Sequence, residues 1–281
     1  METSKALTST EELEAIANRM RCNIVRMTTA AGSGHPGGSL SAVEIITSLW
    51  FSGLMRYRAS EPGWEERDRF ILSKGHAAPV LYAAMAEAGY LEASELLTLR
   101  KLDSRLQGHP DQHKLPGVEV STGSLGQGLS LAVGMALGLR MGGGDQKVFC
   151  LLGDGECQEG QVWEAALYAA QQKANNLVAV IDNNGIQIDG PLADICDVGN
   201  LAGKFREFGW WVTEVDGHSH EALIAAYQEA LATDFAGPRL LVAHTVKGKG
   251  VSFMENTCAW HGKAADAEQC KSALAELGVL S

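Results

Sequence analysis

The spacing of apolar and polar residues predicts two helices near the start of the chain. Ser9 and Glu12 have the spacing of a capping box, and apolar residues then recur along one helical face until Gly32. Residues 41–44 repeat the capping spacing, which predicts a second helix. Between the two helices, residues 33–38 contain too much glycine and proline for a helix or a strand, so this segment is predicted to be a loop.

Short, mainly apolar runs without polar alternation predict buried strands. These runs are residues 70–72, 147–152, 177–181 and 240–246. Helical stretches separate them, such as residues 163–173 and an alanine-rich run that ends before Gly89. Strands of this kind belong to a parallel sheet covered on both faces. The alternation of strand and helix therefore predicts an α/β fold with a doubly wound, mostly parallel sheet, helices on both faces and ligand loops at the carboxyl ends of the strands.

Length and composition narrow the class of protein. A chain of 281 residues with 46% hydrophobic residues can bury a large core, so we expect one domain over residues 1–281 with an amino-terminal helical extension. The net charge of -11 argues against nucleic acid and against an anionic membrane surface as partners. No apolar run is long enough to span a membrane, and residues 1–20 resemble a polar lead into a helix rather than a secretory signal.

The number and spacing of the cysteines indicate the cellular compartment in which the protein works. The six cysteines include no C-x-x-C pair, so neither a disulfide framework nor a zinc site is indicated. Together with the polar start of the chain, this predicts a cytoplasmic protein.

Polar residues follow two of the predicted strands. Asp154 lies between two glycines directly after one strand, and Asn184 follows the next strand along the chain. They are 30 residues apart (184 minus 154), the length of one βαβ unit, whose crossover brings both loops to the same edge of the sheet. Asp, Asn and Gly are also common turn residues. Their joint placement after buried strands nevertheless favours oxygen ligands for Mg²⁺ or Ca²⁺, with a diphosphate bridged to the ion.

Seven short motifs run from residue 33 to residue 262 and cover nearly the whole chain: SGHPG (33–37), SKGH (73–76), GHP (108–110), LPGVEV (115–120), GSLGQG (123–128), GDGECQEG (153–160) and WHG (260–262). In this order they resemble the amino-terminal, diphosphate-binding domain of transketolases. G-D-G followed about thirty residues later by N-N looks like the thiamine diphosphate motif of that family. The resemblance implies a thiamine diphosphate-binding fold of the PP type.

The resemblance also implies which residues hold the metal and the diphosphate. Asp154 and Asn184 match the side chains that ligate the ion, and Ile186 matches the residue that offers a backbone carbonyl. Gly155 matches a backbone N–H that faces the diphosphate, and Lys247 matches a residue beside the cofactor. The implied cofactors are thiamine diphosphate and Mg²⁺ or Ca²⁺.

Histidines in glycine-bounded loops form a second implied group. Imidazole is suited to hydrogen bonding and proton transfer around a polyhydroxylated substrate near neutral pH. In the resembling family, such histidines approach the ketose donor and the cofactor, and the matching ones are His35, His76, His109 and His261. The other four histidines match no motif as clearly and are expected to be structural. The segment implied to lie along the aminopyrimidine ring is Gly123, Ser124 and Leu125.

Two features of the implied cofactor site indicate a partner subunit: Glu159, and a glutamate that has no match in this chain. Glu159 resembles a carboxylate at a subunit interface, although a place in the first turn of a helix accounts for it equally well. No residue matches the glutamate that transketolases direct to the aminopyrimidine ring from a second, pyrimidine-binding domain. We therefore expect the amino-terminal subunit of a split transketolase, active with a separate carboxy-terminal subunit in an α2β2 assembly. Such an enzyme moves a two-carbon ketol unit from a ketose phosphate to an aldose.

Three alternatives remain at this point. Two are other thiamine diphosphate enzymes, namely the alpha-type subunit of a 2-oxo acid dehydrogenase and a deoxyxylulose phosphate synthase-like protein. His35, His109 and residues 260–262 favour a ketose donor over a 2-oxo acid. The third is a non-catalytic thiamine diphosphate-binding regulatory partner, against which stands the absence of any damaging replacement in the motifs.

Overall fold

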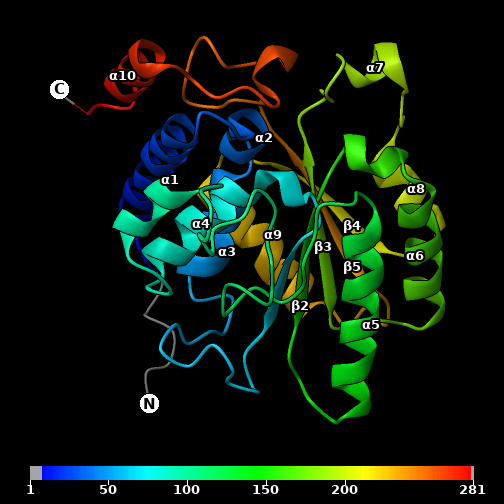
Figure 1. Ribbon diagram of the computed structural model, residues 1–281. Helices are drawn as coiled ribbons and strands as arrows, with labels where there is room; N and C mark the ends of the chain where they lie inside the picture. Colours follow the sequence, from blue (N-terminus) through cyan, green and yellow to red (C-terminus); the bar gives the residue numbers. More distant parts are fainter. Residues whose placement is uncertain (1–7, 280–281) are drawn as a thin grey trace.

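Five parallel strands form a single sheet between two layers of helices in the computed structural model, which describes residues 8–279 (Figure 1). The first seven residues of the predicted polar lead therefore lie outside the described part. The strand order is β1-β2-β3-β5-β4, and every neighbouring pair is parallel. The strands are β1 (Arg69–Leu72), β2 (Val148–Gly153), β3 (Leu177–Asn183), β4 (Trp211–Asp216) and β5 (Arg239–His244). The predicted α/β fold class is confirmed.

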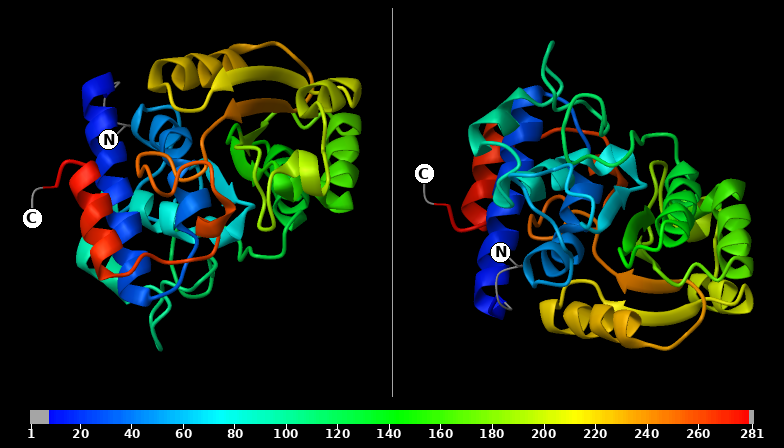
Figure 2. Two further views of the ribbon diagram at one scale, coloured as in Figure 1. Left: turned by 90° about the horizontal axis from the view of Figure 1, so that it is seen from above. Right: turned by 90° about the horizontal axis from the view of Figure 1, so that it is seen from below.

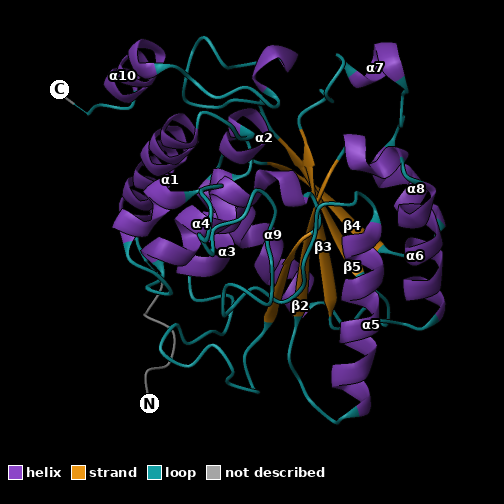
Figure 3. Cartoon of the chain, viewed as in Figure 1, coloured by secondary structure: helices purple, strands orange, loops and turns teal. Residues whose placement is uncertain are grey.

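Helices cover both faces of this sheet (Figure 3). The α-helices are α1 (Thr10–Ala31), α2 (Pro36–Leu40), α3 (Val43–Phe51), α4 (Ala78–Glu87), α5 (Gln127–Met141), α6 (Gly160–Gln171), α7 (Leu192–Ile195), α8 (Leu201–Glu207), α9 (His220–Ala232) and α10 (Ala267–Glu276). Short 3-10 helices are η1 (Gly75–Ala77), η2 (Ala93–Thr98), η3 (Gly155–Gln158) and η4 (Cys258–Trp260). The two ends of the described chain meet where α10 packs along α1 (Figure 2). Within residues 8–279, no helix combines the length and the apolarity that crossing a bilayer requires.

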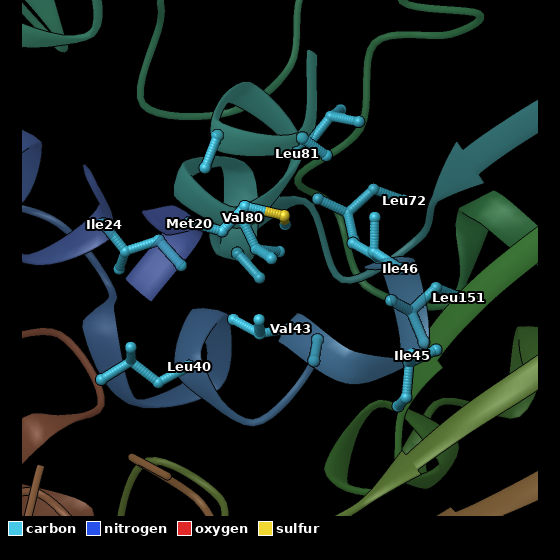
Figure 4. Close-up of a cluster of buried hydrophobic side chains, with 14 of the residues drawn as sticks. Met20, Ile24, Leu40, Val43, Ile45, Ile46, Leu72, Val80, Leu81 and Leu151 are labelled. Carbon is cyan, nitrogen blue, oxygen red and sulfur yellow. The ribbon is translucent and has the colours of Figure 1, made fainter. Parts of the chain in front are cut away.

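Two apolar clusters, one on each face of the sheet, make up the core. Along β2, Phe149 and Leu151 point into the cluster built with α1 to α4 and α9, whereas Cys150 and Leu152 point into the cluster built with α5, α6 and α8. Figure 4 shows Leu151 in the first cluster with side chains from α1, α3 and α4. Because both faces are covered, the strand needs apolar residues at every position, which explains its unbroken apolar run.

The first helix has the predicted boundaries. The Ser9 hydroxyl accepts a hydrogen bond from the Glu12 N–H, and the Glu12 carboxylate accepts one from the Ser9 N–H. At the other end, Gly32 has a φ of 61°, the left-handed conformation that glycine adopts after a helix.

Two predictions for the next segment are wrong. Residues 36–38 of the predicted loop (33–38) belong to helix α2. Pro36 at its first position has a φ that suits a helix start and lacks only an N–H that would have no helical partner. Ser41 does not cap α3. Its hydroxyl instead donates to Asp182 Oδ2 at 2.6 Å, while Glu44 forms an ion pair with α1.

One strand was missed. Strand β4 lies at the edge of the sheet, and only Val215 among its residues is buried. Its sequence, WVTEVD, therefore carries polar residues that interrupt the apolar run on which the strand prediction depended.

Helix α5 packs closely against the residue that follows β1. A Cβ added at Gly128 would lie 2.3 Å from Ser73 Oγ and 2.6 Å from Ser73 Cα. We expect Gly128→Ala to lower the free energy of unfolding by about 1–3 kcal/mol, because the backbone must shift to make room. Gly138 on the same helix has no atom within 4 Å of such a Cβ, so Gly138→Ala is a matched control that should raise stability by up to about 1 kcal/mol. Urea denaturation measures both, and equal effects would contradict the packing argument.

Candidate functional site

A cavity of about 280 Å³ lies at the carboxyl edge of the sheet. The loops after β1, β2, β3 and β5 contribute to its lining, and ligands of parallel α/β sheets bind at this edge. Nearly every residue predicted for the site lines it: His35, His76, His109, Gly123, Leu125, Asp154, Gly155, Glu159, Asn184, Ile186, Lys247 and His261. Ser124 is the exception, since it is exposed and does not line the cavity.

The ends of β2 and β3 bring the two predicted metal-binding loops together. Gly153 pairs with Asp182 at the last register position, so Asp154 emerges beside the loop that follows β3. Asp154 is buried, and its two carboxylate oxygens accept hydrogen bonds from the N–H groups of Gly155 at 2.7 Å and Gly185 at 2.5 Å. These contacts fix the carboxylate while each oxygen keeps further acceptor capacity.

The donor set fits a hard divalent cation held partly by phosphate. Asn184 contributes an amide oxygen, and the Ile186 carbonyl oxygen accepts a hydrogen bond from the Lys247 ammonium at 2.8 Å, so this carbonyl already faces a cation. Burial, followed by the charge of Asp182, raises the pKa of Asp154 to about 6. The buried carboxylate therefore lacks a positive charge that would stabilise its ionised form. Within residues 8–279, no group of three His, Cys, Asp or Glu side chains could hold a metal. An ion here would therefore combine the single Asp154 carboxylate with amide, carbonyl and phosphate oxygens.

The four predicted histidines form one cluster. The ring centroid of His35 lies 5.2 Å from that of His76, 5.5 Å from that of His261 and 6.4 Å from that of His109. The rings of His76 and His261 stack with centroids 5.1 Å apart.

These imidazoles are held in their neutral form. Burial, and next the charge of Arg100, lower the pKa of His35 to about 4. Burial and the charge of Lys247 lower the pKa of His261 to about 3, and burial also lowers the pKa values of His76 and His109. At pH 7 each ring thus carries one donor and one acceptor nitrogen, although the acceptor of His261, Nδ1, is already bound by the Lys247 ammonium.

Lys247 supplies a positive charge within the cavity. Its ammonium donates to the Ile186 carbonyl and to His261 Nδ1 at 2.9 Å. Burial, and next the charge of Lys74, lower its pKa to about 8. The group is still mainly protonated at pH 7 and can bind an anion.

The histidine environment can be tested directly. An NMR pH titration should show His35 and His261 protonating below about pH 5, because their imidazolium forms are disfavoured by burial and by nearby cations. Replacing Lys247 with Met should raise the pKa of His261, because it removes the largest charge contribution. Titration of both rings near pH 6.5 would contradict the proposed environment.

Several residues at the cavity were not predicted. Lys74 and Glu156 lie within the SKGH and GDGECQEG motifs, and Gln187 directly follows Ile186, so each had a sequence signal that was not used. Arg100, which does not line the cavity but whose guanidinium approaches His35 Nδ1 at 3.5 Å, had none.

Buried polar networks hold the strand ends that carry the site. Asp182, which has no exposed surface, accepts hydrogen bonds from Lys74, Ser41 and Thr245. A second network is centred on Glu156, whose carboxylate accepts from Ser73 Oγ at 2.5 Å and from the N–H groups of Gly126 and Gly153 at 2.9 and 3.0 Å.

Glu159 occupies a different position from the predicted first helical turn. It is the residue immediately before α6, at the N-cap, and its side chain is exposed at the rim of the cavity. This position leaves the carboxylate free for contact with another molecule.

Comparison with known proteins places these features in a family. The family described as "Transketolase, thiamine diphosphate binding domain" matches residues 13–280. The chain is 41% identical over 262 residues to a 6-deoxy-6-sulfo-D-fructose transketolase subunit of Clostridium sp. (strain MSTE9), covering 92% of this chain and 94% of that protein. It is 40% identical over 267 residues to an apulose-4-phosphate transketolase subunit of Phocaeicola vulgatus, covering 95% of this chain and 94% of that protein.

Longer transketolases match over part of their length. The chain is 46% identical over 256 residues to human transketolase, and this match covers 90% of this chain and 40% of the human protein. The crystal structure of transketolase from Campylobacter jejuni superposes with a TM-score of 0.91 and 33% identity, covering 96% of this chain and 43% of that one. This chain thus spans about two fifths of the length of these relatives. By sequence and by fold, it belongs to the transketolase family through the thiamine diphosphate-binding domain.

Proposed function

We propose that this chain is the amino-terminal subunit of a two-subunit transketolase that moves a two-carbon ketol unit from a ketose phosphate to an aldose. The observation that carries the proposal is the convergence, in one cavity, of oxygen ligands, a buried ammonium and four neutral imidazoles. Thiamine diphosphate, when bound, supplies the thiazolium ring that serves as the electron sink for cleavage of a carbon–carbon bond. The protein's own contribution is binding, orientation and proton transfer.

The cofactor's diphosphate end would be held by the loops after β2, β3 and β5. Asp154, Asn184 and the Ile186 carbonyl would ligate Mg²⁺ or Ca²⁺. The Lys247 ammonium would bind phosphate oxygens, since it is a hydrogen-bond donor at the cavity. The Gly155 N–H would bind phosphate by transferring to it the hydrogen bond that it now donates to Asp154 Oδ1. The aminopyrimidine ring would lie along the segment 123–125.

The histidine cluster would orient the sugar. His76 and His261 would lie nearer the diphosphate, and His35 and His109 nearer the ketose. Because all four rings are neutral at pH 7, each carries a donor nitrogen for a hydroxyl group of the sugar, and His76 and His109 also carry an acceptor nitrogen that can take up a proton. In His35 and His261, Nδ1 already accepts from Arg100 and Lys247.

The partner would be a separate carboxy-terminal subunit with the pyrimidine-binding domain, in an α2β2 assembly. The near-complete match to two proteins named as transketolase subunits supports a two-chain enzyme. Ile188, which lines the cavity, is 60% exposed, and Leu125 lies on the same lining. Apolar side chains at the mouth of a polar site are typically covered by another chain. Glu159, exposed at the same rim, would lie at a subunit interface.

The sugar that donates the two-carbon unit would be a ketose that carries a terminal anionic group. The cellular compartment of the enzyme would be the cytoplasm. The named relatives act on a sulfonated ketose and on a ketose phosphate, which favours a ketose over the 2-oxo acid of the dehydrogenase alternative. The described cysteines are all free thiols, as is typical of a reducing compartment.

The decisive experiment mixes the purified chain with a separately expressed polypeptide that carries a transketolase pyrimidine-binding domain, thiamine diphosphate, Mg²⁺, a ketose phosphate and an aldose acceptor. Two-carbon transfer should require both polypeptides. Robust turnover by this chain alone would overturn the two-subunit proposal. Tight cofactor binding without turnover in the presence of the partner would instead favour the regulatory alternative.

A further inference from the structure

A buried carboxylate on α3 is bound from two sides. Glu44 is 6% exposed, and its Oε2 atom lies 2.9 Å from Nδ1 of His218, which belongs to the loop between β4 and α9. Its other oxygen, Oε1, accepts a hydrogen bond from the guanidinium of Arg21 on α1, also buried. Three separate elements thus meet at one carboxylate.

Both partners of Glu44 hold the same backbone turn, residues 246–250. The Val246 N–H donates to His218 Nε2 at 2.8 Å, so the ring proton sits on Nδ1, where it faces Glu44. The Arg21 Nε–H donates to the Lys249 carbonyl oxygen at 3.1 Å. These two contacts lie on either side of Lys247.

The position of the Lys247 ammonium depends on this turn. The Lys247 side chain reaches the cavity from this turn. Two further backbone hydrogen bonds hold the turn: the Gly248 N–H donates to the Gly37 carbonyl oxygen at 3.0 Å, and the Asn256 N–H donates to the Lys247 carbonyl oxygen at 2.9 Å. Gly248 has a φ of 80°, and a Cβ there would lie 2.2 Å from the Met254 carbonyl oxygen, so the turn admits little alternative packing.

We infer that Glu44 is a positioning residue, which acts through His218 and Arg21 to hold the turn that directs the Lys247 ammonium at the cofactor's diphosphate. The inference rests on the proposed function, because that function gives Lys247 its anion. The carboxylate itself does not line the cofactor cavity. Groups that orient the direct ligands of a site in this way typically change affinity by 10- to 100-fold when removed.

Hydrogen exchange tests the clamp without reference to the cofactor. Arg21 and His218 contact different oxygens of Glu44, and in Glu44→Gln one of these two positions becomes an NH2 group, which is a donor and cannot accept. Backbone amide exchange in residues 246–250 should become about tenfold faster, because losing a hydrogen bond to a charged group lowers the free energy of local opening by an amount of this order. His218→Asn removes both the acceptor for the Val246 N–H and the donor to Glu44 but leaves the Arg21 contact, and should speed exchange at the Val246 amide even if Glu44→Gln folds poorly.

A double-mutant cycle tests whether the effect passes through Lys247. Glu44→Gln should weaken thiamine diphosphate affinity, measured by calorimetry with Mg²⁺ on the full chain and its partner, by about tenfold. In a Lys247→Met background the same substitution should have little further effect, because coupled residues are not additive. A merely structural role would reduce affinity equally in both backgrounds.

The matched control is Glu87→Gln. Glu87 also pairs with an arginine of α1, Arg19, at 2.8 Å, but neither residue touches the turn. Glu87→Gln should leave both the amide exchange of residues 246–250 and the affinity for thiamine diphosphate unchanged. Unchanged exchange at 246–250 in Glu44→Gln, or an equal loss of affinity with and without Lys247, would overturn the inference. If the wild-type complex binds no thiamine diphosphate, the proposed function fails while the exchange result still decides the clamp.

Discussion

Asp154→Ala should abolish the rise in Tm that thiamine diphosphate and Mg²⁺ give the protein. At a cofactor concentration about a hundred times Kd, binding stabilises the folded state by about 2.7 kcal/mol, or roughly 5–10 °C for a domain of this size. The carboxylate is the only charged member of the proposed ligand set, and the residues beside it offer neutral oxygens. Removing it leaves an amide and a carbonyl, which bind a divalent ion weakly.

Asp189→Ala is the matched control for this experiment. Asp189 lies in the same loop as Asn184 but is exposed and does not line the cavity. Differential scanning fluorimetry with and without the two ligands should show a normal rise for Asp189→Ala. A full rise in Tm for Asp154→Ala would show that the metal does not bind at the proposed site.

The pH dependence of the same rise is a second readout. The pKa of Asp154, about 6, lies above the usual 3.8 because of burial and then Asp182. In the ligand-free chain this group's contribution to stability is fully present below pH 3.8 and is lost as the pH rises through 6. A bound cation offsets that loss, so the rise in Tm should be larger at pH 7.5 than at pH 5.5.

The site was predictable where its chemistry is local. Asp154 and Asn184 each follow a buried strand directly, and a parallel sheet brings all carboxyl ends to one edge. Their convergence therefore depends on nothing more distant than one βαβ unit. The four histidines were found through short motifs, but the resemblance to a family, rather than their spacing, implied that they would meet.

The unpredicted parts depend on contacts between distant segments. Ser41 has the spacing of a helix cap, yet its hydroxyl bonds Asp182, 141 residues away, which local patterning cannot detect. Arg100 reaches His35 across 65 residues from a loop without any motif. Strand β4 was missed for the opposite reason, because an edge position permits polar residues and so removes the apolar signal.

Lys74→Met should be the most destabilising single substitution considered. The side chain of Lys74 is 2% exposed, and its ammonium pairs with Asp182, which is fully buried, so the change leaves a carboxylate without its counter-charge. Breaking such a pair from one side typically costs about 3–5 kcal/mol. Urea denaturation at pH 7 measures the loss. Arg19→Met is the control, because Arg19 is 55% exposed in its ion pair and should cost at most about 1 kcal/mol.

The sign of the pH effect distinguishes a lost ion pair from lost packing. In the native protein, burial raises the pKa of Asp182, but Lys74 and the hydroxyl donors Ser41 and Thr245 outweigh it, so the net pKa is lowered. That stability is present above pH 3.8 and is lost as the pH falls through the lowered value. Without Lys74, burial dominates and the carboxyl group takes up a proton more easily, so the deficit of Lys74→Met should shrink as the pH falls from 7 to 5. Adding Asp182→Asn should recover part of the deficit at pH 7. A deficit that is independent of pH and unchanged in the double variant would mean that the lysine stem contributes packing alone.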